Sequence, residues 1–218
     1  MSLVSDRCIC IRRIEYSETS QILRLFARDH GLIRVIAKGA HRTTKAGASR
    51  FGGGIDLLDV GEAVFSHAPQ RDLPPLAEWR LLEGHRELRH NLRAIYLATY
   101  AAELVGALLE EHDPHPDLFY RLEGTLKELS TPLREGSMIA FQLDLLRDVG
   151  LLPELEFCQN CGREVAMQRV AFFVPDRGGV ACRNCQVNFP DRFEIDCRLL
   201  RLARTLLQLP RTDGQPRR

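Results

Sequence analysis

The chain has 218 residues, of which 44% are hydrophobic and 27% are charged, and its formal net charge at pH 7 is +1. This composition is that of a globular protein with room for two domains of modest size, so intrinsic disorder is not expected. A net charge near zero does not by itself indicate a nucleic-acid partner, and only the distribution of charge along the chain can do so.

The first eighty residues contain short apolar segments that are separated by glycines. Five of these segments have β-branched or aromatic residues inside and turn residues at their ends, which predicts strands over Arg7–Ile14, Gln21–Ala27, Leu32–Ala37, Gly54–Phe65 and Pro75–Leu82. Five short strands in succession fit a small closed barrel, of which the oligonucleotide-binding (OB) fold is the commonest example. We therefore predict an OB-fold barrel as the N-terminal domain, over residues 1–82.

From Trp79 onward the composition changes to leucine, alanine, glutamate and arginine, which favour helices. The predicted helices are 92–111, 118–129 and 136–149, and a last amphipathic helix follows along Leu199, Leu202, Leu206 and Leu209. Helices with wide apolar faces must pack on one another or on the barrel. We assign residues 83–218 to a helical domain and expect Trp79, Leu81, Tyr96 and Tyr100 in the core between the domains.

The sequence shows no signal for export or membrane insertion. Its N-terminus lacks a basic region followed by an apolar core and a small-residue cleavage site. The most apolar stretch, 94–109, is interrupted by Thr99 and Glu103 and is shorter than the ~20 residues that a membrane-spanning helix needs. We therefore expect a cytoplasmic protein.

Four of the seven cysteines form two C-x-x-C pairs, Cys158 with Cys161 and Cys182 with Cys185. In a reducing compartment this spacing indicates metal binding rather than disulfides. Four thiolates fill the tetrahedron that zinc prefers and leave no position for water, so such a site is structural rather than catalytic. We predict one structural Zn²⁺ in a zinc ribbon over about residues 157–190, with a strand at 170–174 between the pairs.

Other interpretations of the cysteines remain. The four paired cysteines could instead be two redox pairs, unrelated thiols or ligands of an iron–sulfur cluster, although the common cluster spacings are different. The remaining three, Cys8, Cys10 and Cys197, are expected as small buried hydrophobic residues.

A basic stretch lies in the predicted barrel. No acidic residue occurs between positions 29 and 56, whereas five basic side chains do, namely Arg34, Lys38, Arg42, Lys45 and Arg50. On a barrel surface these cations could neutralise several phosphates, and the glycines among them would let a nucleic-acid backbone approach. Phe26 and Phe51 are the only phenylalanines in the region, so phosphate contacts are favoured over base stacking. The alternative is a solvated basic face without a ligand.

The sequence has no recognisable catalytic machinery. It contains no HExxH or GxSxG motif, and the glycines at 52–54 lack the following lysine and serine or threonine of a P-loop. His85 and Glu87 supply the H-x-E of zinc deaminases, but Phe157 rather than proline precedes the first cysteine pair, and four thiolates would leave no site for water. We predict that the protein is not an enzyme.

Several segments together resemble the RecO family of bacterial recombination mediator proteins. Residues 35–42 (VIAKGAHR) resemble the turn after the third barrel strand of that family, and residues 141–153 (FQLDLLRDVGLLP) resemble the helix that leads into its zinc module. Residues 158–162 (CQNCG) follow at the expected place, and the match covers nearly the whole chain. Family members commonly continue with further helical residues after the zinc module, whereas this sequence ends at Arg218.

The resemblance implies an α+β protein with an N-terminal five-stranded OB-fold barrel and a central helical domain in which a four-cysteine zinc ribbon is embedded. It also implies binding of single-stranded and double-stranded DNA, strand annealing, contact with the single-strand-binding protein, and cooperation with RecR in loading RecA during DNA repair by the RecF pathway. The positions that match the family's motifs are the four paired cysteines, Lys38 and Arg42, whereas Arg34, Lys45 and Arg50 are placed by charge. The alternative function is a zinc-ribbon interaction module in a transcription or assembly complex, with the basic stretch against an acidic protein surface.

Overall fold

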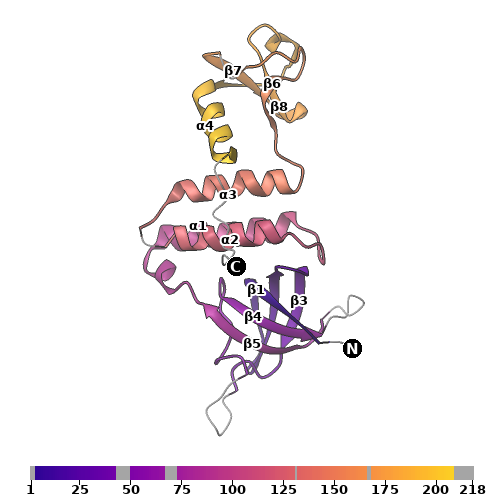
Figure 1. The fold of residues 1–218 in the computed structure, drawn as a ribbon, viewed down its shortest axis with the longest axis vertical. Coiled ribbons are helices and arrows are strands. Elements are labelled where there is room, and N and C mark those ends of the chain that lie inside the picture. Colours follow the sequence, from indigo (N-terminus) through magenta and orange to yellow (C-terminus); the bar gives the residue numbers. More distant parts are fainter. Residues whose placement is uncertain (1–2, 43–49, 67–72, 131, 166–167, 209–218) are drawn as a thin grey trace, which may run out of the picture. The chain divides into compact units, whose positions relative to one another are not determined.

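The computed structural model describes residues 3–42, 50–66, 73–130, 132–165 and 168–208 (Figure 1). Its contacts divide the chain into two compact units, one that extends to Phe141 and one that begins at Gln142. This division falls inside helix α3 (Glu135–Asp148). The domain boundary predicted after residue 82, between barrel and helices, stays a prediction.

The first unit begins with a five-stranded antiparallel sheet of order β3-β2-β1-β4-β5. Its strands are β1 (Leu3–Ser17), β2 (Ser20–Ala27), β3 (Gly31–Ala37), β4 (Val60–Ser66) and β5 (Leu76–Glu83). The two edges approach each other where the N–H of Ile36 donates to the carbonyl of Pro74 at 3.0 Å and Ile36 forms a parallel bridge with Pro75. This strand order and contact are those of an OB-fold barrel, which confirms the predicted fold class.

The predicted fourth strand was too long at its N-terminal end, because the observed β4 begins at Val60 and not at residue 54. Leu58 has a φ of 70°, and the N–H of Asp59 donates to the carbonyl of Asp56 at 3.2 Å. A left-handed residue within a hydrogen-bonded turn cannot continue an extended strand.

Inward-facing side chains of all five strands fill the barrel. This core consists of Cys8, Cys10, Leu23, Leu25, Ala27, Ile33, Val35, Ala37, Ala40, Phe51, Ile55, Ala63, Phe65, Leu76 and Trp79. Trp79 therefore belongs to the barrel's own core and not to a core between domains. The expectation for Leu81, Tyr96 and Tyr100 was also wrong, since their exposed fractions are 47%, 65% and 48%.

Two helices cover part of the barrel's outer surface (Figure 1). A short 3₁₀ turn, η1 (Arg86–His90), precedes α1 (Leu92–Leu108), and α2 (Pro116–Glu128) follows. Asn91 caps α1, because its side-chain oxygen accepts the backbone N–H groups of Arg93 and Ala94. On the barrel side, Phe26 of β2 packs against Phe119 of α2 with ring centroids 5.6 Å apart.

The second unit contains the cysteine module, a four-stranded sheet of order β6-β8-β7-β9. Its elements are β6 (Glu154–Cys158), β7 (Val170–Val174), η2 (Pro175–Arg177), β8 (Gly179–Ala181), η3 (Gln186–Asn188), β9 (Phe193–Asp196) and α4 (Cys197–Gln208). The strand predicted at 170–174 is confirmed as β7, whereas β6, β8 and β9 were not predicted. Within the described part of the chain, none of the helices combines the length and apolarity that crossing a membrane would require.

Candidate functional site

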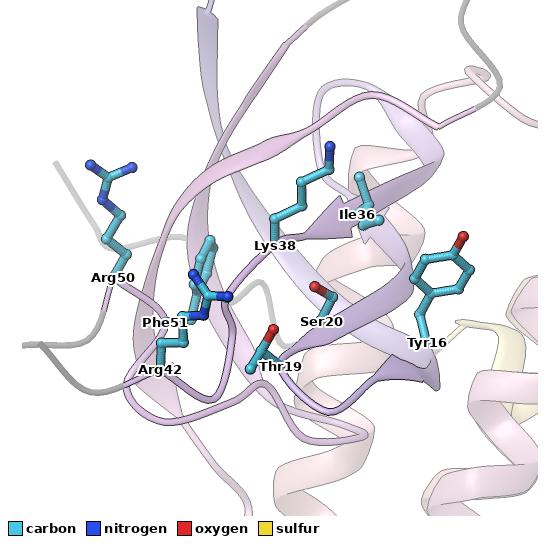
Figure 2. Close-up of a pocket in the computed structure, with 9 residues that line it drawn as sticks. Tyr16, Thr19, Ser20, Ile36, Lys38, Arg42, Arg50 and Phe51 are labelled. Atoms are coloured by element: carbon cyan, nitrogen blue, oxygen red, sulfur yellow. The ribbon is translucent and has the colours of Figure 1, made fainter.

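A groove of about 570 Å³ opens on the barrel where the ends of β1, β2 and β3 meet (Figure 2). It is lined by Tyr16, Thr19, Ser20, Ile36, Lys38, Gly39, Arg42, Arg50 and Phe51. Three stretches of chain that are distant in sequence build it: the β1–β2 hairpin, the end of β3 with the turn that follows, and residues 50 and 51. The barrel fold thus gathers cations and hydroxyl groups on one surface.

Three of the lining side chains are cations, Lys38, Arg42 and Arg50, and all three are exposed. Gly39, with a φ of 75°, forms a turn in which the N–H of Arg42 donates to its carbonyl at 3.0 Å, and this turn brings Lys38 and Arg42 to the same groove. Across the described ranges, no acidic side chain forms an ion pair with any of the three cations. The groove therefore has a positive potential that favours an anionic ligand.

Sequence reasoning identified the groove's cations but not its other walls. The structure brings Lys38, Arg42 and Arg50 together, whereas Arg34 lies outside the groove on β3 and Lys45 lies outside the described residues. The hydroxyl-bearing wall, with Tyr16 at its end, was missed. Tyr16 has an exposed fraction of 65%, and the signal that could have found it was the short hairpin turn that follows it in the sequence.

A polar network holds the turn that carries Arg42. The Nε2 of His41 lies 2.9 Å from the Glu15 carboxylate, and its Nδ1 lies 3.1 Å from the carbonyl of Gly53. Since both partners are acceptors, the imidazole makes both bonds only when it is doubly protonated. The side chain of buried Gln21 also donates to Glu15 at 3.0 Å.

Both ionisable members of this network have shifted pKa values. The hydrogen bond from Gln21, and then that from His41, lower the pKa of Glu15. The pKa of His41 is raised, first by the hydrogen bond between its ring and Glu15 and then by the bond to the carbonyl of Gly53. The charged forms of Glu15 and His41 therefore support each other and fix the turn next to the groove.

The four paired cysteines converge in the second unit. The sulfur atoms of Cys158, Cys161, Cys182 and Cys185 all lie within 4.8 Å of one another, and the Sγ atoms of Cys161 and Cys182 are 3.8 Å apart. A tetrahedron with metal–sulfur bonds of about 2.3 Å has edges of about 3.8 Å, so the cluster has the dimensions of a four-thiolate metal site. This group could hold a metal ion.

Hydrogen-bond donors around the sulfurs also fit a thiolate site. The N–H of Cys182 donates to the Sγ of Cys158, and the side-chain amide of Asn160 donates to the Sγ of Cys185, each at 3.3 Å. Burial would raise the pKa of Cys158, but backbone donors, led by that of Cys182, outweigh it and lower the pKa to about 6. The Asn160 amide lowers the pKa of Cys185, but the neighbouring thiols, led by Cys182, outweigh it and raise the pKa to about 11. The neighbouring thiols thus oppose the ionisation of Cys185, and a bound cation would favour its thiolate form.

The remaining cysteines are buried, as expected. Cys8 and Cys10 belong to the barrel core. Cys197 lies in the core of the cysteine module, where its thiol donates to the carbonyl of Val165 at 3.4 Å. None of the three belongs to the metal-binding group.

Comparison with known proteins identifies the family. The family profile described as "Recombination protein O N terminal" matches residues 1–85, and that described as "Recombination protein O C terminal" matches residues 89–215. The DNA repair protein RecO of Anaeromyxobacter sp. (strain K) is 32% identical over 183 residues, which cover 84% of this chain and 70% of that protein. The RecO proteins of Rhodopirellula baltica (33% identical, 82% of this chain and 65% of that protein) and Salinibacter ruber (34%, 71% and 59%) are also similar. The chain therefore belongs to the RecO family of DNA repair proteins.

Proposed function

We propose that this protein binds DNA through the barrel groove and acts without catalysis as a strand-annealing mediator of recombinational repair. The observation that supports this proposal most strongly is the gathering of Lys38, Arg42 and Arg50 around one groove without an acidic partner among the described residues. Such cations neutralise backbone phosphates and release counterions, which is the main sequence-independent contribution to DNA affinity. Tyr16 and the neighbouring hydroxyl groups add a ring for stacking and donors for phosphate oxygens.

Family membership supports the biological setting of this proposal. Relatives that cover most of this chain are named DNA repair proteins. We propose that the protein works in the RecF pathway in the bacterial cytoplasm, at the nucleoid, where it contacts the single-strand-binding protein and, with RecR, helps to load RecA. In this role the protein brings strands and partners together and transforms none of them.

We also propose that the four-cysteine group holds one Zn²⁺. The all-sulfur donor set and the tetrahedral dimensions suit a structural zinc ion, since four thiolates fill its coordination sphere. When bound, the ion would neutralise thiolates and fix the short strands of the module. The chain's own donors, Asn160 and the backbone of Cys182, would orient the ligands.

The test of DNA binding is a fluorescence-anisotropy titration of a labelled single-stranded oligonucleotide at several salt concentrations. The variant Lys38→Ala/Arg42→Ala is compared with wild type and with Arg80→Ala/Arg93→Ala. Arg80 and Arg93 are exposed arginines of the same unit, but each is paired with a glutamate, so this control removes the same charge from outside the groove. We expect the groove variant to bind DNA about tenfold or more weakly than wild type. The logarithm of its association constant should also fall less steeply with the logarithm of salt concentration, by about 1.4 in slope, or 0.7 for each lost phosphate contact.

The control variant should bind nearly as tightly as wild type. An equal loss of affinity in both variants would show that only total charge matters, and it would contradict DNA binding in the groove. If folded, metal-loaded wild type does not bind DNA even at low salt, the proposal fails. The zinc-ribbon interaction module would then be the working hypothesis.

A further inference from the structure

One of the four metal-binding cysteines differs from the others in its exposure to solvent. Cys161 is exposed, whereas the exposed fractions of Cys158, Cys182 and Cys185 are 3%, 2% and 9%. Cys161 lies in a turn that the N–H of Gly162 closes by donating to the carbonyl of Cys158 at 2.9 Å. The turn has open space beside it, because a Cβ added to Gly162 would meet no atom within 4 Å. Small molecules in solution can therefore reach the sulfur of Cys161 before they reach the other three.

Hydrogen bonds weaken two of the buried sulfurs as nucleophiles. Backbone donors, led by the N–H of Cys182, act on the Sγ of Cys158, and the side-chain amide of Asn160 donates to the Sγ of Cys185. Such donors draw electron density away from sulfur. Among the residues that the structure describes, no N–H group donates to the Sγ of Cys161. Cys161 thus combines access to solvent with a sulfur that no such donor weakens.

Cys182 is placed to react with an oxidised Cys161. The two Sγ atoms are 3.8 Å apart, and burial shields Cys182 from direct attack by a reagent in solution. The two cysteines belong to different C-x-x-C pairs, so a bond between them would take one ligand from each pair. An accessible thiol beside a second, resolving thiol is the arrangement typical of cysteines that sense oxidants.

We propose that Cys161 is an oxidation site through which hydroperoxides release the metal ion of the cysteine module. The Cys161 thiolate attacks one oxygen of hydrogen peroxide, which forms an S–O bond, breaks the O–O bond and gives a sulfenic acid and hydroxide. The Cys182 thiolate then attacks the Cys161 sulfur, forms the disulfide and expels a second hydroxide. The two sulfurs together lose two electrons, and the peroxide gains them. This inference rests on the proposed zinc site.

The disulfide removes two of the four ligands from the metal-binding group. Cys158 and Cys185 remain, and two thiolates cannot complete the tetrahedron of a structural zinc site. The module then loses the contribution that metal binding makes to its folding. In the barrel, Cys8 and Cys10 have exposed fractions of 0%, so the peroxide does not reach them in the folded state. Since a dithiol can reduce the disulfide and restore the ligands, the module is a reversible redox switch beside a barrel that keeps its fold.

The test exposes full-length, zinc-loaded protein to hydrogen peroxide, follows released zinc with a metal-sensitive dye, and maps disulfides by mass spectrometry of peptides. Wild type is compared with Cys161→His, which keeps a zinc ligand but removes the exposed sulfur. Cys197→Ser is the matched control, because Cys197 is a buried cysteine of the same module outside the metal-binding group. We expect wild type and control to release one zinc ion per chain and to form the disulfide between Cys161 and Cys182. Cys161→His should release zinc at least about tenfold more slowly.

The outcomes separate this inference from the zinc site on which it rests. Zinc release from Cys161→His at the wild-type rate, or a first disulfide without Cys161, would overturn the proposal. If Cys161→His binds no zinc, wild type alone decides, because Cys161 must be its first oxidised residue. Zinc that stays bound to wild type in excess peroxide would contradict the switch and leave the zinc site in place. Wild type purified without zinc would refute the zinc site and the switch together.

Discussion

The barrel and the cysteine module are stabilised in different ways. The barrel encloses a core of fifteen buried residues drawn from positions 8 to 79, and its two edge strands approach each other at one backbone bridge. The core of the module has eleven buried residues, four of which are cysteines, and its strand β8 is only three residues long. Hydrophobic burial can stabilise the first region by itself, whereas so small a second region would depend on the metal ion that we propose for it. Stability and ligand binding can therefore be disturbed separately in the two regions.

The largest expected effect is that of metal removal on the module. Chelation, or the substitution Cys158→Ser, should unfold residues 154–208, because a structural zinc ion contributes about 10 to 16 kcal/mol in comparable peptides. The barrel should keep its slow hydrogen exchange. Exchange measured by mass spectrometry, with metal content measured in parallel, checks both statements.

Cys8→Ala is the matched control, because Cys8 is a buried cysteine of the barrel and lies outside the metal-binding group. It should keep one metal ion per chain and an intact module, although the barrel loses some stability. Simultaneous unfolding of barrel and module after chelation would contradict their independence.

A second prediction concerns the barrel's attachment to the α1–α2 connection. Gly31 has a φ of 68°, and a Cβ there would lie 2.2 Å from the carbonyl oxygen of Asp113. Gly52 has a similar φ of 62°, but a Cβ there meets nothing within 4 Å. Gly52→Ala should therefore lower the free energy of unfolding by only about 1 to 2 kcal/mol, because alanine disfavours the left-handed conformation. Gly31→Ala should lower it clearly more. Denaturant unfolding of both variants measures the difference, and equal costs would show that the close approach to Asp113 is unimportant.

A smaller effect is expected from the network beside the groove. The pKa of His41 is raised, so its stabilising contribution is complete below its ordinary pKa and disappears as pH rises through the raised value. The pKa of Glu15 is lowered, so its contribution is present above its ordinary pKa and disappears as pH falls through the lowered value. The turn should thus be held best at mildly acidic pH. NMR titration of the His41 ring should give a raised pKa that returns toward its ordinary value in Glu15→Gln, and an unchanged pKa in that variant would exclude the pairing.

Much of the fold followed from local sequence patterns. Alternation of apolar residues located the five barrel strands, and the cysteine spacing identified the metal-binding group. The strands β6, β8 and β9 escaped prediction, whereas the wholly apolar β7 did not. β8 and β9 have only three and four residues, and β6 mixes charged with apolar residues and pairs in parallel with a strand distant in sequence. Such short segments have too little periodicity to be recognised.

The groove was only half predictable for a related reason. Its cations Lys38 and Arg42 lie in one basic stretch, whereas Tyr16 and Ser20 reach the same surface only because β2 pairs with both β1 and β3. The position of Arg34 on the outer face depends on register, because a shift of one residue would turn its side chain to the other face of the sheet. Charge along the sequence therefore indicated a ligand, and strand pairing determined where that ligand can lie.

The most direct test of the account is hydrogen exchange of the intact, metal-loaded chain with and without a saturating single-stranded oligonucleotide. We predict slower exchange in residues 16–20, 36–42 and 50–51, with no change over 154–196. Protection confined to residues 154–196, with an unchanged barrel, would contradict the assignment of DNA binding to the groove.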